Sequence, residues 1–394
     1  MKEIYLDNAA TTAVRPEVAE AMQPFFTDIY GNPSSLHTIG QKAKRALEQA
    51  RQEVADVLKA DPGEIIFTSG ATESNNLAIK GFAHANRDRG NHLITSPIEH
   101  HAALYVFQAL ERQGFETTYL PVDRHGLVDL DALRDSIRPE TILISVMLAN
   151  NEIGTIEPLP SISAIARERG IAVHTDAVQA IGKIPLSVKD LDVDFLSLTA
   201  HKFYGPKGVG VLYKRNGVII HPLFEGGHQE HILRPGTENI PGVVGLSIAL
   251  RLAYQDLDSE PARFETLRNR LEEGILTRIG QVTVNGHPHR RVPNISSLSF
   301  AFVEGEALLL SLDTMGIAVS TASACSAGTT EPSHVLKAIG LDPLLAQGTL
   351  RFSLGRINSA DEVDYVIDSL AETVTRLREL SPIRETKNPA NNGV

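Results

Sequence analysis

The feature that most constrains the fold is an alternation of short β-rich runs with longer helical segments, which starts near residue 64. Residues 64–70, 92–97, 116–122, 141–148, 171–178, 195–201 and 208–214 have the length and the apolar content of strands. Residues 72–85, 100–114, 130–137 and 159–170 lie between several of these runs and have helical patterns. This alternation is typical of a large, mostly parallel sheet with helices packed on it, so we predict an α/β fold.

The last third of the chain has a different order of elements. Two helices, at about 243–256 and 261–279, precede strands at 281–285 and 295–302, a helix at 306–314, a strand at 349–354 and a long amphipathic helix at 361–380. We therefore predict a large domain of residues 15–255 and a smaller α+β domain that combines residues 1–14 with 256–380. The tail 381–394 is rich in Pro and Asn and is expected to be poorly ordered.

Charge and composition exclude several classes of function. The chain has 394 residues, with 37 Lys and Arg against 48 Asp and Glu, a net charge of −11 that argues against nucleic acid or an anionic membrane as partner. No apolar run is long enough to span a bilayer. Because Met1 opens directly into predicted structure, we expect no cleaved signal peptide and a cytoplasmic location. The single cysteine, Cys325, excludes an internal disulfide and a cysteine-based zinc knuckle.

A turn rich in small residues follows the first predicted strand of the sheet, at Phe67-Thr68-Ser69-Gly70-Ala71-Thr72-Glu73-Ser74-Asn75. A helix that begins there directs free N–H groups and its positive end at one point, where a phosphate would fit. A simple capped helix is the alternative. The turn is not a Walker loop, because no Gly-Lys-Thr/Ser follows, and no G-x-G-x-x-G stands at a strand–helix junction.

Two further strand ends carry polar groups. Asp176 ends an apolar run in His174-Thr175-Asp176-Ala177-Val178-Gln179, and Lys202 follows Phe195–His201. An acid there suits a protonated pyridine nitrogen, and a desolvated lysine suits imine formation with an aldehyde. A helix-capping aspartate and a surface lysine are the alternatives. Together with the phosphate turn, these residues suit pyridoxal 5'-phosphate.

Cys325 lies in Val319-Ser320-Thr321-Ala322-Ser323-Ala324-Cys325-Ser326-Ala327-Gly328, a stretch of small residues that is predicted to be a mobile loop. A structural cysteine normally has bulky apolar neighbours, so this pattern favours a reactive thiol. Arg351 lies within a strand pattern and could hold a substrate carboxylate or form a structural ion pair. His100 and His101 start a helix, where a histidine could also only cap or pack. No His, Asp and Glu set has metal-ligand spacing.

Taken together, these motifs resemble the cysteine desulfurases of the NifS/IscS type, within the class V aminotransferase-like group of pyridoxal-phosphate enzymes. The resemblance extends from Tyr5 to about Leu380 and rests on GNPSS (31–35), FTSGATESNN (67–76), ANNEIG (149–154), HTDAVQ (174–179), HKFYGPKGVG (201–210), RPGTEN (234–239), SACSAG (323–328) and RFSLGR (351–356). It implies the aspartate aminotransferase-like fold of pyridoxal-phosphate transferases. One departure lies before the cysteine, where Thr321 and Ala322 replace the Ser and Gly common in the family, which restricts the backbone.

The resemblance also implies residue roles. Lys202 would be the internal aldimine lysine, His100 the imidazole stacked on the cofactor ring and a proton shuttle, and Asp176 the partner of the pyridine nitrogen. Gln179 and Asn151 would contact the phenolic-oxygen side of the ring. The phosphate would be held by Ala71, Thr72, Thr199 and His201, and by Thr237 from the other subunit of a homodimer. Arg351 would bind the substrate carboxylate, and Cys325 would accept sulfur.

The implied activity is conversion of L-cysteine to L-alanine, with sulfur transferred to Cys325 as a persulfide and passed to an iron–sulfur scaffold or another acceptor protein. A transient contact of Cys325 with iron through the persulfide is a further implication. A selenocysteine lyase or an aminotransferase on the same fold, and a non-catalytic sulfur carrier, are the alternatives.

Overall fold

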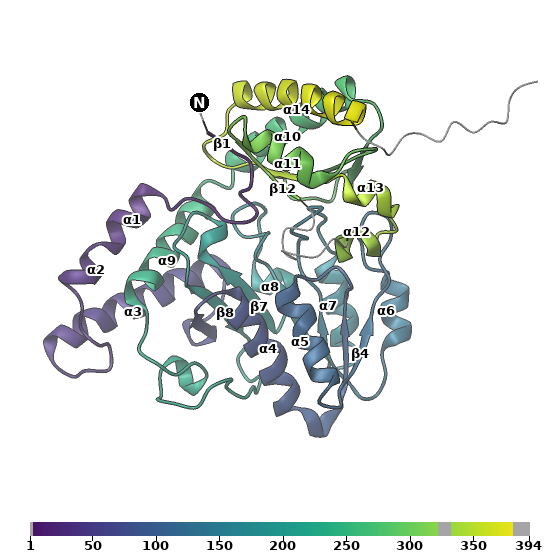
Figure 1. Ribbon diagram of the computed structural model, residues 1–394. Helices are drawn as coiled ribbons and strands as arrows, with labels where there is room; N and C mark the ends of the chain where they lie inside the picture. The colour runs from purple at the N-terminus through teal and green to yellow at the C-terminus, as the bar shows by residue number, and fades with distance from the viewer. Residues whose placement is uncertain (1–2, 322–331, 381–394) are drawn as a thin grey trace, which may run out of the picture.

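The computed structural model describes residues 3–321 and 332–380, and a seven-stranded sheet forms its centre (Figure 1). The strand order is β2-β8-β7-β6-β5-β3-β4. Strands β3 (His92–Thr95), β4 (Glu116–Tyr119), β5 (Thr141–Ser145), β6 (Ala172–Asp176) and β7 (Phe195–Thr199) pair in parallel. Only β8 (Gly210–Lys214) runs against its neighbours β7 and β2 (Ile65–Thr68). The prediction of a mostly parallel sheet is therefore confirmed.

Helices cover both faces of this sheet, because successive side chains of a strand point to opposite sides. Ile65 and Phe67 of β2 pack in the hydrophobic core shared with α3 (Thr38–Leu58), α7 (Leu159–Arg167) and α9 (Ile240–Gln255). Ile66, between them, packs in a second core with α4 (Ala71–Ala85) and α5 (His101–Glu111). A sheet buried on both faces leaves its strand ends as the places where a ligand can approach.

A four-stranded sheet forms the upper part of the molecule in Figure 1, with the order β12-β13-β10-β9. It consists of β9 (Val282–Asn285), β10 (Ile295–Phe300), β12 (Ser320–Thr321) and β13 (Thr349–Ser353), and packs with α10 (Glu260–Arg278), α11 (Gly305–Asp313) and α14 (Ala360–Leu380). The N-terminal strand β1 (Ile4–Tyr5) pairs with β11 (Ile317–Ala318), and Ile4 and Leu6 lie in the same core. The exact domain boundaries, including the one near residue 255, stay a prediction.

Several short elements were not expected from the sequence. They are α1 (Pro16–Met22), α2 (Pro24–Thr27), α8 (Val188–Leu191), α12 (His334–Ala338) and α13 (Pro343–Gln347). By contrast, α6 (Leu130–Ser136) agrees with the helix predicted at 130–137. Helices of four to seven residues are too short to show a helical period, so only α6, which follows the capping residue Asp129, was found. The stretch predicted as a loop from Val319 begins instead as strand β12, since Ser320 and Thr321 pair with Arg351 and Leu350.

Candidate active site

A cleft of about 670 Å³ lies at the ends of β2, β6 and β7, below the edge of the four-stranded sheet. The strand ends, the N-terminal segment and β13 all contribute to it. The predicted site residues that line it are Ala71, Thr72, His100, Asn151, Asp176, Gln179, Thr199, His201, Lys202 and Arg351. Thr237 lies outside the cleft, and Cys325 lies outside the residues that the structure describes. Residues that are far apart in the sequence thus converge on one cavity.

The turn between β2 and α4 has the form of an anion site. Gly70 precedes the helix with a φ of +152°, a conformation that favours glycine. Thr68 Oγ1 lies 2.8 Å from Ser74 Oγ, which fixes the turn, and Ser69 N–H donates to Glu73 Oε2 at 2.7 Å. The first N–H groups of α4, at Ala71 and Thr72, have no carbonyl of the preceding turn to bond, so they are available to a phosphate.

Asp176 ends β6 and is 5% exposed. Its Oδ2 accepts a hydrogen bond from Asn75 Nδ2 at 2.8 Å, and its Oδ1 accepts one from the Val178 N–H at 3.0 Å. Both donors are neutral, so these hydrogen bonds orient the carboxylate but do not neutralise its charge. It can therefore pair with a positively charged ligand atom in the cleft.

Lys202 ends the 3₁₀ turn η3 (Ala200–Lys202), directly after β7. Its Nζ donates to the carbonyl oxygens of Ala9 at 2.6 Å and Ala10 at 2.7 Å. The N-terminal segment is held there by Thr12, whose N–H donates to the His201 carbonyl oxygen at 2.9 Å. The amine thus lies at the boundary between the large sheet and the N-terminal segment, facing the cleft.

His100 both caps a helix and lines the cleft, so the two interpretations of this residue are compatible. Its Nδ1 accepts a hydrogen bond from the Ala102 N–H at 3.1 Å. In the neutral ring the proton therefore lies on Nε2. Burial lowers the pKa of His100; Asp176 acts to raise it and Lys202 to lower it. A neutral imidazole with a fixed tautomer suits proton transfer.

Arg351 of β13 reaches the cleft from the four-stranded sheet. Its Nη2 pairs with Asp7 Oδ1 at 2.8 Å, and its Nη1 donates to the Asn151 carbonyl oxygen at 2.9 Å. The structural ion pair considered from the sequence is therefore present. Among residues 3–321 and 332–380, none accepts a hydrogen bond from the buried Arg351 Nε, so within this part of the chain the guanidinium has unused donor capacity beside the cavity. This arrangement can accommodate a carboxylate ligand as well as Asp7.

Thr199, His201 and Gln179 occupy the wall between these groups. Thr199 Oγ1 donates to the Val209 carbonyl oxygen at 3.1 Å, and His201 Nδ1 lies 3.2 Å from Thr11 Oγ1. Burial, with a smaller contribution from Lys202, lowers the pKa of His201 to about 4, so its ring is neutral near pH 7. Gln179 Nε2 donates to the Ala9 carbonyl oxygen at 3.0 Å.

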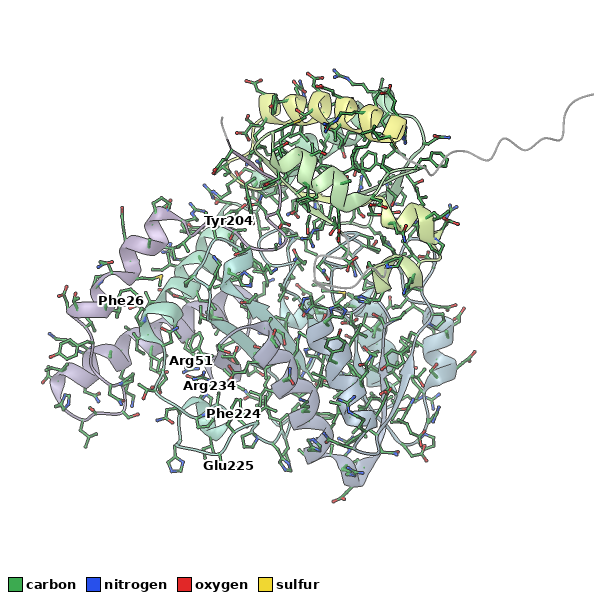
Figure 2. All side chains as sticks on the ribbon, viewed as in Figure 1. Phe26, Arg51, Tyr204, Phe224, Glu225 and Arg234 are labelled. Carbon is green, nitrogen blue, oxygen red and sulfur yellow. The ribbon has the colours of Figure 1, made fainter. Side chains whose placement is uncertain are left out.

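Thr237 is exposed on a segment that a buried ion pair anchors. Arg51 of α3 donates to both carboxylate oxygens of Glu230, at 2.9 and 2.6 Å, and Arg234 Nε donates to Glu73 at 3.0 Å. Both arginines are labelled in Figure 2. Glu230, His231 and Ile232 (η4) all have positive φ, of 41°, 59° and 70°, a strained conformation that the ion pair stabilises. The segment therefore presents Thr237 to the surface of its own subunit.

Three contributors to the cleft were not identified from the sequence. They are Asn75, which holds Asp176, Asp7, which pairs with Arg351, and the carbonyl oxygens of Ala9 and Ala10. Asn75 belongs to the motif that was recognised, but its distance from Asp176 along the chain hides their contact. Every residue has a backbone carbonyl, so the sequence does not show which carbonyl oxygens contact Lys202.

Within residues 3–321 and 332–380, no three His, Cys, Asp or Glu side chains are grouped so as to hold a metal ion. None of the helices described by the structure combines the length and the apolar character needed to cross a membrane.

The chain is similar in sequence to a known family and to several known proteins. The model of the family described as "Aminotransferase class-V" matches residues 4–366. The chain is 53% identical over 382 residues to the cysteine desulfurase IscS of Methanosarcina thermophila, with 97% of this chain and 94% of the relative covered. It is 52% identical over 384 residues to the cysteine desulfurase IscS of Dictyoglomus turgidum, with 98% of each covered.

Solved structures agree with these matches. A structure titled "NIFS-LIKE PROTEIN" has a TM-score of 0.90 and 42% identity, and covers 95% of this chain and 100% of its own. A structure titled "SspA in complex with cysteine" has a TM-score of 0.80 and 39% identity, with 90% and 99% covered.

Proposed function

The chain belongs to the class V aminotransferase family, and on this premise we propose that it is a cysteine desulfurase, which converts L-cysteine to L-alanine and transfers the sulfur to Cys325 as a persulfide. One observation carries the proposal: Asp176, Lys202, His100 and Arg351, from separate elements, line one cleft beside an anion-binding turn. Relatives at about half identity over nearly the whole chain are named for this activity.

The residues of the cleft fit pyridoxal 5'-phosphate. The N–H groups at the start of α4 suit its phosphate, aided by Thr199 and His201, and Asp176 suits its pyridine nitrogen because the carboxylate has only neutral donors. Gln179 and Asn151 suit its phenolic oxygen, and Lys202 suits its aldehyde. When bound, this cofactor supplies a conjugated ring that accepts electrons from the substrate Cα.

Four side chains of the cleft have separate roles in the reaction. Arg351 binds the substrate carboxylate and so orients the amino acid in the cleft. The amine of Lys202 takes the proton from Cα, and Asp176 keeps a proton on the pyridine nitrogen. His100, with its proton on Nε2, transfers a proton near the leaving sulfur.

Cys325 accepts the sulfur of the substrate. Its thiolate attacks the sulfur of the substrate, so that an S–S bond forms on Cys325 while the Cβ–S bond breaks and its electron pair stays on the carbon. Protonation of that carbon leads to alanine. Because the chain contains one cysteine, no second thiol within it can resolve the persulfide. We expect the purified persulfide to persist until an acceptor or a reductant is added.

We also propose that the protein acts as a homodimer in which Thr237 reaches the phosphate of the partner's cleft. Thr237 is exposed and lies outside its own cleft. Large apolar side chains are also exposed, among them Phe26 at 58%, at the left in Figure 2, and Phe224 at 59%, below Arg234 in the same view. Apolar groups in such positions suit a protein interface.

The sulfur acceptor is proposed to be an iron–sulfur scaffold or another acceptor protein in the cytoplasm, with iron contacting Cys325 only through the persulfide. A selenocysteine lyase or an aminotransferase would use the same cleft, and assays with L-selenocysteine, or with alanine and a keto acid, separate these activities. A non-catalytic sulfur carrier would bind no cofactor.

The test uses the purified protein and two variants, Cys325→Ser and the neighbouring Ser326→Ala. We expect a visible absorption band in all three proteins. Alanine formation from L-cysteine should fall to background in Cys325→Ser and remain in Ser326→Ala. A colourless wild-type protein that gains no band with added pyridoxal phosphate, or normal turnover by Cys325→Ser, would contradict the proposal.

A further inference from the structure

Lys183 is a second lysine close to the cleft and is almost completely buried. It lies four residues after Gln179, and its N–H donates to the Ala180 carbonyl oxygen at 3.0 Å. Gly182, with a φ of +69°, turns the chain between them, and a Cβ there would lie only 2.8 Å from Ala253 Cβ. Lys183 is 7% exposed and Gln179 2%, so both side chains are fixed in the interior.

The two side chains are in direct contact. Lys183 Nζ donates to Gln179 Oε1 at 3.2 Å, while Gln179 Nε2 donates to the Ala9 carbonyl oxygen at 3.0 Å. A lysine ammonium can only donate, so the amide oxygen must face Lys183 and the NH₂ group must face away from it. One N–H of that NH₂ bonds Ala9, and the other is left on the side of the cleft that Gln179 lines.

We propose that Lys183 is a positioning residue: it locks the amide of Gln179 so that a nitrogen, and not an oxygen, faces the phenolic oxygen of pyridoxal phosphate. The inference rests on the proposed function, since it assigns Gln179 to that oxygen. If the amide turned over, its oxygen would face both the Ala9 carbonyl and the phenolic oxygen, and three acceptors would meet without a donor.

The surroundings of Lys183 determine its protonation state and so how it bonds to Gln179. Lys183 and Lys202 line a cavity together with the charged groups of Arg15, Asp256, Glu260 and Arg356 and the phenol of Tyr204. Burial, assisted by the charge of Lys202, lowers the pKa of Lys183 to about 7. The ammonium form can only donate, whereas the neutral amine can donate or accept, so Lys183 fixes the amide most strongly below pH 7. The Ala9 carbonyl oxygen, which can only accept, holds the NH₂ side of Gln179 in both states.

The test compares Lys183→Met, Gln179→Ala and the double variant as cofactor-bound proteins. Two properties are measured: the apparent affinity for pyridoxal phosphate, from the return of the visible band as cofactor is added back, and the pH midpoint of that band. A donor at the phenolic oxygen favours the deprotonated chromophore, so Lys183→Met should raise the midpoint. We expect it to weaken cofactor affinity roughly 5- to 10-fold, the loss of about one hydrogen bond.

The double variant separates positioning from a direct effect of charge. If Lys183 acts through Gln179, the double variant should match Gln179→Ala in both properties. Additive shifts, or wild-type values for Lys183→Met, would overturn the proposal. Lys214→Met is a matched control, because Lys214 is a half-buried lysine at the other end of the sheet that donates to the Val218 carbonyl oxygen at 3.1 Å, and it should change neither property.

Lys183→Arg keeps a donor that cannot accept, so it should retain the wild-type midpoint. If Lys183→Met does not fold, a shifted midpoint in folded Lys183→Arg would overturn the proposal. Failure of the proposed function is distinguishable from these results. A wild-type protein that forms no alanine from L-cysteine but keeps its visible band would refute the desulfurase activity alone, and one that gains no band would refute the cofactor assignment.

Discussion

The two edges of the seven-stranded sheet hold buried carboxylates in opposite ways. At the edge where β6 and β7 begin, Asp194 is bound by Arg167 at 3.0 Å and Arg215 at 3.1 Å, and both arginines also bind Asp192. At the edge where these strands end, Asp176 is held by the side-chain amide of Asn75 and the N–H of Val178.

The difference separates a structural charge from a functional one. Burial acts to raise the pKa of Asp192, but hydrogen bonds from Arg167 and Arg215 outweigh it and the pKa is lowered, as expected where protein cations neutralise the charge. Neutral donors orient the carboxylate of Asp176 but leave its charge available. A cationic ligand atom can then pair with this charge, so the second arrangement indicates a binding site.

The largest effect is expected for Lys202→Ala, which removes the amine at the edge of the sheet where β6 and β7 end. Activity should fall by roughly 10⁴-fold, because both cofactor attachment and proton removal are lost. Borohydride reduction of the wild-type protein, followed by peptide mass analysis, should find the cofactor on Lys202. Lys214→Ala, at the edge where β6 and β7 begin, should keep normal activity. Cofactor trapped on any lysine other than Lys202 would refute the assignment.

Glu99 extends the comparison, because neutral donors also hold this fully buried carboxyl: Ser96 Oγ at 2.7 Å and the Met147 N–H at 2.8 Å. Burial raises its pKa from 4.5 to about 8. The folded protein therefore binds this proton more tightly than the unfolded chain. The stability it contributes is complete below pH 4.5 and is lost as the pH rises through about 8.

Glu99→Gln cannot ionise, so it should lose this part of the pH dependence. Urea unfolding at pH 5, 7 and 9 should show the variant gaining stability over the wild type as pH rises, by up to about 4 kcal/mol. Burial also raises the pKa of Glu157 to about 8 and that of Glu152 to about 7, so part of the dependence should remain. The exposed Glu140→Gln is the control, and equal pH profiles for Glu99→Gln and wild type would contradict the assignment.

Asp176→Asn tests the functional carboxylate directly. The shape of the side chain is kept while its charge is removed, so we expect catalytic turnover to fall by about 10²–10³-fold, the typical cost of losing one charge-stabilising group. Cofactor absorbance and thermal unfolding should show a folded protein. Near-normal turnover would mean that Asp176 only maintains the turn with Val178.

Asp194→Asn should produce the opposite pattern. Loss of its charge leaves Arg167 and Arg215 without one shared partner, and we expect a loss of about 2–3 kcal/mol in unfolding free energy, since both arginines are about one-third exposed and water partly compensates. Activity per folded molecule should be unchanged. If Asp194→Asn reduced turnover as strongly as Asp176→Asn, the distinction between the two edges would not hold.

Much of the fold could be predicted because its signals are local. The β-rich runs that became β5 to β7 and the amphipathic pattern of α14 depend on neighbouring residues in the chain. Short helices such as α12 and α13 could not be found, since five residues do not complete enough turns to show a period. Strand β12 was missed because its residues are small, and its pairing with β13 is a long-range contact.

The sequence by itself determined which chemical groups stand at strand ends, because a strand and the residue that terminates it are consecutive. Asp176, Lys202 and the turn before α4 could therefore be identified as a set. Only the tertiary structure decided their partners: Asn75 for Asp176, the carbonyl oxygens of Ala9 and Ala10 for Lys202, and Lys183 for Gln179. Such contacts depend on packing between elements, and the orientation of an amide depends on which donor packing places beside it.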